Sequence, residues 1–142
     1  MNKFLFPPLV IFYILISIVL FSCKKDPGQG GTSFINGKVY ARYYNKTFSA
    51  KLSEGYAPKI GVYIIYGNNV SYGDNQSTSF DGSFEFRYLQ KGDYTIYAYS
   101  KDSTGAYTGA VNIYAPNVAI IKKVTITGRK QTVTVPDIQI IH

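Results

Sequence analysis

The chain has 142 residues, 46% of them hydrophobic and 16% charged, which suits one folded domain and excludes an intrinsically disordered protein. The formal net charge is +7, but the basic residues are spread along the chain, which is typical of a solvated surface. One histidine, His142, and one cysteine, Cys23, exclude a zinc site of the usual composition and a histidine-dependent catalytic triad.

The chain begins with a segment that is typical of exported proteins. Lys3 supplies a positive start, and an apolar run extends from Phe4 to Phe21. Pro7 and Pro8 leave Leu9–Phe21 as the continuous apolar part, which has the length of a signal-peptide core and is short for a transmembrane helix. We therefore predict a signal peptide over residues 1–22.

The end of this segment, Leu20-Phe21-Ser22-Cys23, resembles the lipobox of bacterial lipoproteins. In that family the cysteine thiol receives a diacylglyceryl group, the chain is cut before the cysteine, and the new amine is acylated. The resemblance implies lipidation of Cys23 with fatty acids such as palmitate. It also implies that the membrane is a partner through this lipid. An uncleaved apolar anchor with an unmodified thiol would have the same topology and remains an alternative.

The location that follows from a lipobox is the cell envelope. Lys24 stands where an aspartate would mark inner-membrane retention in the best-known sorting rule, so the resemblance favours the outer membrane. Residues 23–33 are predicted to be the lipidated cysteine and a flexible, glycine-rich tether. Nucleic acid is not the normal partner of an exported protein. If the basic surface binds a partner, we expect lipid headgroups or acidic glycans.

Residues 34–142 are predicted to form strands and no helix, because apolar residues alternate with polar ones between turn signals. In Tyr94–Ser100, Tyr94, Ile96 and Ala98 should face one side and Tyr97 and Tyr99 the other. Asp81-Gly82 predicts a tight turn into a strand that contains Phe84 and Phe86. The other predicted strands are Phe34–Tyr44, Ile60–Tyr66, Gln76–Phe80, Ala106–Tyr114, Val118–Thr127 and Gln131–Ile141.

About seven short strands without a helix predict an all-β, antiparallel, seven-stranded β-sandwich, since parallel strands would need crossover helices. The order of residues resembles the carboxypeptidase regulatory-like, transthyretin-like (prealbumin-like) domains. The stretches that carry this resemblance are Gly37-Lys38-Val39, Gly61–Ile64, Thr78–Phe86, Leu89–Ile96 and Pro136–Ile140. The resemblance implies the sandwich fold and a binding or accessory role. Transthyretin-like hydrolases of purine-derived rings use several histidines, which this chain lacks.

One segment departs from that family. Asn45–Lys59 is longer than the family's usual first hairpin, and a long loop at the end of a sandwich is where ligand contacts often lie. A plain surface loop is the alternative, because an insertion there costs little stability.

Tyrosine supplies the candidate partner surface. Tyr63, Tyr97 and Tyr99 stand at strand positions that should face outward, where exposed rings can stack on sugars or anchor a protein. Tyrosine is also a common strand residue on a half-buried face, so a purely structural role is the alternative. The lack of tryptophan favours a protein partner over a glycan.

Other candidate chemistry is weaker. Gly73–Gln76 and Lys101–Gly105 could offer oxygen ligands to calcium, but both are better interpreted as turns. A covalent cross-link between the side chains of Lys38 and Asp137, assisted by Glu85, is not expected. Alternation along the strands places Lys38 and Glu85 on the solvent-exposed face of the sheet. We therefore expect no metal, cofactor or enzymatic activity.

The sequence thus predicts an outer-membrane lipoprotein that carries a non-enzymatic binding or accessory β-sandwich, with an unidentified protein or glycan as its partner. The alternative hypothesis is a structural surface or fimbria-associated subunit that pairs strands with a neighbour.

Overall fold

The computed structural model describes residues 26–105 and 116–142, which form strands, turns and bends without a helix. The predicted signal peptide, Cys23 and the predicted strand Ala106–Tyr114 lie outside these residues. In the described ranges, no helical segment has the length and hydropathy needed to cross a membrane.

The described part of the chain contains nine strands, two of them unexpected. One lies inside the predicted loop 45–59, and the last predicted strand is divided in two by the segment that contains Pro136. In chain order the strands are β1 (Gln29–Tyr44), β2 (Lys51–Tyr56), β3 (Gly61–Tyr66), β4 (Asp74–Ser77), β5 (Ser83–Leu89), β6 (Gly92–Lys101), β7 (Asn117–Ile126), β8 (Thr132–Thr134) and β9 (Ile138–Ile141).

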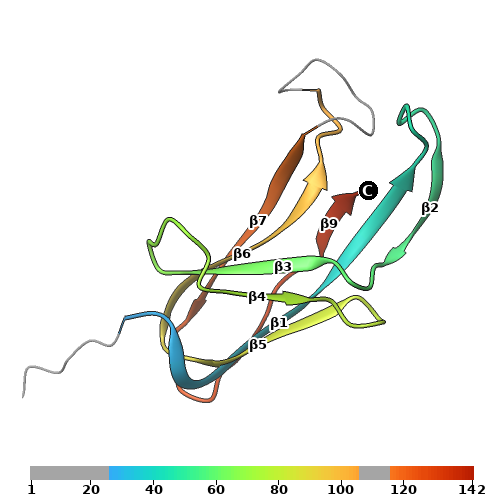
Figure 1. Ribbon diagram of the computed structural model, residues 1–142. Helices are drawn as coiled ribbons and strands as arrows, with labels where there is room; N and C mark the ends of the chain where they lie inside the picture. The colour runs from blue at the N-terminus through green and yellow to red at the C-terminus, as the bar shows by residue number, and fades with distance from the viewer. Residues whose placement is uncertain (1–25, 106–115) are drawn as a thin grey trace, which may run out of the picture.

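These strands form two sheets that pack face to face. The first sheet has the order β2-β1-β5, with β8 and β9 also paired to β1, and the second has the order β4-β3-β6-β7. Figure 1 shows β5 running below β4 in the view, and β9 lying between β6 and the β1–β2 hairpin. The predicted all-β sandwich is therefore confirmed.

The prediction of an entirely antiparallel sandwich is wrong for β8 and β9. Both pair parallel to β1: Ile35 lies opposite Val133, and Ala41 lies opposite Ile140. Between β1 and β8 the chain runs through the second sheet. Because strands of the second sheet form part of the long connection from β1 to β8, these parallel strands need no helix as a crossover.

The core lies between the sheets and follows the predicted alternation. Tyr94, Ile96 and Ala98 are buried along β6, as are Phe84 and Phe86 along β5. The other buried apolar residues are Ile35, Val39, Ala41, Ala57, Val62, Ile64, Leu89, Ile126, Val135, Ile138 and Ile140.

The predicted turn at Asp81-Gly82 is confirmed. Gly82 has a φ of +76° and donates its N–H to the carbonyl oxygen of Ser79 at 2.9 Å. The Asp81 carboxylate accepts hydrogen bonds from the backbone N–H and the hydroxyl of Ser83, which holds the turn closed.

β1 begins at Gln29, within the segment 23–33 that we predicted to be a tether. The backbone N–H of Gly28 donates to the Tyr94 hydroxyl oxygen at 3.1 Å, and that hydroxyl donates to the carbonyl oxygen of Gln90 at 2.7 Å. A Cβ on Gly31 would lie 1.9 Å from the Leu89 carbonyl oxygen, so the backbone itself packs there. Residues 28–33 are thus fixed to the sandwich.

Candidate functional site

The three predicted tyrosines lie on the outer face of the second sheet. Tyr63 of β3 is opposite Tyr97 of β6, and Tyr97 is opposite Ile121 of β7. Their immediate neighbours along β3 and β6, including Val62 and Ala98, are buried, so alternation points the tyrosines away from the core.

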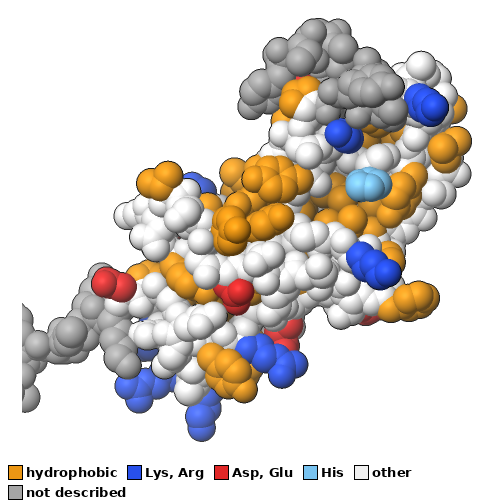
Figure 2. Space-filling model, in the orientation of Figure 1, with side chains coloured by type: hydrophobic (Ala, Val, Ile, Leu, Met, Phe, Trp, Pro, Cys, Tyr) orange, Lys and Arg blue, Asp and Glu red, His pale blue; other side chains and the backbone are white. Residues whose placement is uncertain are grey.

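Tyr63 is the centre of a cluster of rings. Its ring stacks on that of Tyr97, with centroids 5.1 Å apart and planes at 16°, and meets Tyr99 at 5.6 Å and Tyr72 at 5.2 Å in edge-on contacts. We call Tyr63, Tyr72, Tyr97 and Tyr99 the tyrosine face. Figure 2 shows hydrophobic side chains gathered over β3 and β6.

Tyr72 was not predicted. It lies in the connection between β3 and β4, where the sequence has no alternating pattern, and its position depends on how that connection folds back. Ile121, which is 54% exposed, extends the same face onto β7.

A pocket of about 340 Å³ opens beside Tyr99 at one end of this face. Ala119 is the register partner of Tyr99 on one side, and Gly61 lies on the neighbouring strand on the other. Because both neighbours are small, the Tyr99 ring remains 46% exposed and a depression forms over Gly61. Its lining residues are Lys59, Ile60, Gly61, Tyr63, Tyr99, Lys101, Asn117, Ile141 and His142.

Two basic side chains, Lys59 and Lys101, line the pocket, and none of the described residues in its lining is an aspartate or a glutamate. His142 lies at its rim, with its ring edge-on to Tyr43 at 5.6 Å. In Figure 2 the histidine lies to the right of the hydrophobic group, with basic side chains above and below it. A cationic wall beside an exposed ring suits a ligand with a ring-like face and a negative charge.

The Tyr97 hydroxyl is protonated at neutral pH. Burial, followed by the neighbouring Tyr99, raises the pKa of Tyr97 above its ordinary value of 10.0. A neutral phenol can both donate and accept a hydrogen bond, so the face offers polar groups as well as rings.

The segment 45–59, predicted as a long loop, contains strand β2. Tyr40 pairs with Tyr56, and Arg42 pairs with Glu54, whose carboxylate also meets Lys51 at 2.8 Å. The hairpin turn is closed by the side chain of Asn45, which accepts hydrogen bonds from the backbone N–H groups of Ser49 and Ala50. Residues 45–56 thus form an ordered hairpin on the first sheet, whereas Lys59, at the end of the segment, lines the pocket beside Tyr99.

Of the two candidate calcium segments, Lys101–Gly105 leaves β6 in a turn, in which Asp102 accepts from the N–H and the hydroxyl of Thr104. The turn interpretation is wrong for Gly73–Gln76, because Asp74–Gln76 belong to β4, where Asp74 accepts from the N–H of Asn75 and the amide of Gln29. Over residues 26–105 and 116–142, no three His, Cys, Asp or Glu side chains come together in a way that could hold a metal ion.

The residues of the rejected cross-link have other partners. Lys38 donates to Asp81 at 3.0 Å, Asp137 accepts from the Tyr56 hydroxyl at 3.1 Å, and Glu85 pairs with Arg87. Lys38 and Glu85 lie at outward positions of the first sheet, as alternation predicted.

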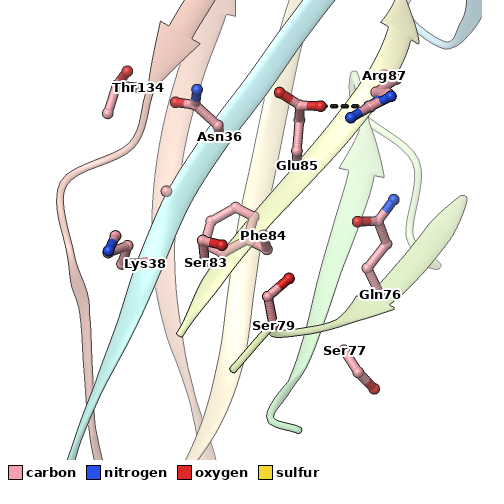
Figure 3. A pocket seen from close by; sticks show the side chains of 11 residues that line it. Asn36, Lys38, Gln76, Ser77, Ser79, Ser83, Phe84, Glu85, Arg87 and Thr134 are labelled. Carbon is pink, nitrogen blue, oxygen red and sulfur yellow. Dashed lines mark hydrogen bonds and ion pairs between the residues drawn. The ribbon is translucent and has the colours of Figure 1, made fainter. Parts of the chain in front are cut away.

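A larger cleft of about 650 Å³ lies over the first sheet. Figure 3 shows its polar lining, including Asn36, Lys38 and Glu85, with Glu85 directed at Arg87. Its charges are already compensated, because Lys38 pairs with Asp81 and Glu85 with Arg87. The cleft has no exposed aromatic ring in its lining, since Phe84 is 4% exposed. We therefore favour the tyrosine face as the binding surface.

No protein-family model matches the chain, and no curated protein matches it. Among solved structures, the chain is similar to a crystal structure described as "a putative carbohydrate binding protein" from Pseudomonas aeruginosa. The sequence identity is 16% and the TM-score is 0.44, over 77% of this chain and 90% of that one. A likeness of this size does not carry a ligand or a function over to this chain.

Proposed function

We propose that this chain is a lipid-anchored, non-enzymatic binding module of the bacterial cell envelope, and that it contacts its ligand through the tyrosine face. The observation that carries the proposal is the clustering of four tyrosines beside a basic pocket on one exposed sheet face. Aromatic side chains supply large contact area at little cost in conformational entropy, and they dominate many recognition surfaces. The transthyretin-like assignment of the sandwich is part of this proposal.

The proposed anchor is Cys23, on the resemblance of Leu20–Cys23 to a lipobox. Residues 24–28 separate this cysteine from β1, and five extended residues span at most about 18 Å. The sandwich would therefore lie close to the membrane surface. The intact mass of the membrane-extracted chain tests the anchor: a chain that starts at residue 23 with added acyl mass, lost in Cys23→Ala, supports it, and an unmodified chain that retains residues 1–22 contradicts it.

The described strands give less support to the alternative of a subunit that pairs strands with a neighbour. Among them β7 pairs only with β6, so its other edge is a candidate for such pairing. Lys122 and Lys123 lie in the middle of β7, and Lys122 stands at an inward, half-buried position. Charged residues at such positions are a common protection against edge-to-edge pairing.

Tyrosine footprinting tests the binding surface. The full chain is iodinated with and without the envelope fraction of its own cells, and modification is measured residue by residue by mass spectrometry. Protection of Tyr99 and Tyr72, with Tyr88 on the first sheet unchanged, supports the proposal. Equal modification of Tyr99 in both conditions contradicts it.

A further inference from the structure

We propose that the pocket beside Tyr99 binds a negatively charged sugar unit of an acidic polysaccharide, and that the rest of the tyrosine face carries the neighbouring sugars. This inference rests on the proposed function and names its ligand class. It reverses the preference for a protein partner that the lack of tryptophan suggested.

The first step is the shape of the pocket. Gly61 has no side chain, and an added Cβ would lie 3.2 Å from the hydroxyl of Tyr63, so the floor of the pocket is backbone with the end of Tyr63 beside it. Tyr99 forms a wall that is 46% exposed. The volume of about 340 Å³ is at the small end of ligand pockets, which suits a single ring rather than a folded segment.

The second step is the charge. Lys59 lies just before β3, and Lys101 is the last residue of β6, so two chain segments bring positive charge to the same end of the sheet. The carboxylate of a uronic acid is a single negative group that a lysine can bind as a point charge. The amide of Asn117 adds a donor and an acceptor for sugar hydroxyls.

The third step distinguishes a polysaccharide from a protein partner. Tyrosine is enriched in protein interfaces, but lysine is depleted there, because its ammonium group loses strong hydration on burial. Here the lysines line the pocket itself. A polysaccharide also needs a site open along one direction, and Tyr63, Tyr97 and Tyr72 continue the face away from Tyr99.

The fourth step is the position of the pocket relative to the anchor. Gly28, next to the tether, contacts Tyr94 near the start of β6, whereas Lys101 ends that strand. Ten residues of strand span about 30 Å, so the pocket lies at the end of the sandwich that is distal from the tether. Figure 1 shows this arrangement, with the start of β1 at the lower left and the C-terminus at the upper right. A polymer outside the bilayer could reach the pocket there.

The test is a titration of the full chain, in a non-ionic detergent, with an oligogalacturonate hexamer and with the same hexamer fully methyl-esterified. The two probes share a backbone and differ in charge. We expect binding of the acid and at least tenfold weaker binding of the ester. Poly-glutamate of equal charge is the third probe, and it should also bind at least tenfold more weakly.

Three variants localise the binding. Gly61→Val fills the floor of the pocket, Tyr99→Ala removes the exposed ring, and Lys59→Gln removes one charge. Each should weaken binding of the acid about tenfold, equivalent to about 1.4 kcal/mol. Tyr88→Ala and Lys91→Gln, which alter exposed residues outside the pocket, should leave it unchanged. A urea midpoint for each variant confirms that it is folded.

Several outcomes would overturn the inference. Equal affinity for the acid and the ester removes the role of charge, and equal affinity for poly-glutamate removes the role of the sugar. Absence of binding to the acid overturns it as well, and if Tyr99 is still protected by the envelope fraction, the proposed binding surface stands while its ligand is of another class, such as a protein.

Discussion

Tyr63 and Tyr97 stack across the β3–β6 strand pair with their centroids 5.1 Å apart and their planes at 16°. The pair occupies the centre of the tyrosine face, because Tyr63 also meets Tyr72 and Tyr99. We therefore assign different tasks to rings of the same type: Tyr63 holds the face together, and Tyr99 presents itself to a ligand.

This division predicts effects of different size on stability for two substitutions. Tyr63→Ala removes three ring contacts and should lower the free energy of unfolding by about 1–3 kcal/mol. Tyr99→Ala should change it by less than about 1 kcal/mol, because this ring is 46% exposed. Urea denaturation of both variants measures the difference, and a larger loss for Tyr99→Ala would refute the assignment.

The stability of the fold should depend strongly on the glycine in the turn that precedes β5. At Gly82 the φ is +76°, and a Cβ would lie 2.9 Å from the carbonyl oxygen of Val39. Gly82→Ala should therefore destabilise the fold by about 1–3 kcal/mol. Gly55→Ala is the matched control, since no atom lies within 4 Å of its added Cβ, and it should be neutral or slightly stabilising. Thermal unfolding compares the two, and equal effects would contradict this explanation.

The hydroxyl of Tyr94 predicts how the N-terminal segment is held. Tyr94→Phe removes the hydrogen bonds to Gly28 and Gln90, which should cost about 1–2 kcal/mol. It should also speed proteolysis near residues 28–31. Tyr88→Phe, at an exposed position, is the control. If the two variants are cleaved at the same rate, another contact fixes this segment.

The charge of the Asp81 carboxylate should account for part of the loss of folding stability at acid pH. Hydrogen bonds from Ser83, and then from Lys38, hold the pKa of Asp81 well below its ordinary value of 3.8. Because the folded-state pKa is lowered, the charge stabilises the fold fully above pH ~4, near the unfolded value, and progressively less as the pH falls toward the folded value. Asp81→Asn should thus be less stable than the wild type at pH 7, with a gap that shrinks below pH ~4. Denaturation between pH 7 and pH 2.5 measures the gap, and a constant gap would exclude this role for the charge.

The lysines of β7 should prevent copies of the protein from associating through the free edge of this strand. If Lys122 and Lys123 protect the edge, Lys122→Val combined with Lys123→Thr should produce dimers or larger species in detergent. Light scattering after size-exclusion chromatography measures this, with Lys46→Thr as the control for lost charge. A monomeric double variant would mean that the edge is protected in another way.

Much of the fold was predictable, because alternation along a strand directly states which side chains face a core. Tyr94, Ile96 and Ala98 follow this rule. The strand β2 was missed because Lys51–Glu54 is exposed on both faces, so no apolar pattern marks it. The parallel pairing of β8 and β9 was missed because it depends on long-range sheet order, which local pattern does not encode.

The outward positions of Tyr63, Tyr97 and Tyr99 were predicted for the same reason, but their assembly into one surface was not. It requires β3 and β6 to be neighbours in a particular register. The pocket could not be predicted from the sequence either. It forms because Gly61 and Ala119 lie on either side of Tyr99, and because two lysines that are distant in the sequence lie at the same end of the sheet. No local motif marks such a site.

The most direct test of the tyrosine face is a photo-crosslinker, p-benzoylphenylalanine, placed at position 99 or at position 88 in living cells. Both positions carry exposed tyrosines, on different sheets. We expect a crosslinked species of defined mass from position 99 and none from position 88, whether the captured partner is a glycan or a protein. Crosslinking from position 88 with none from position 99 would contradict the proposal that this face binds the ligand.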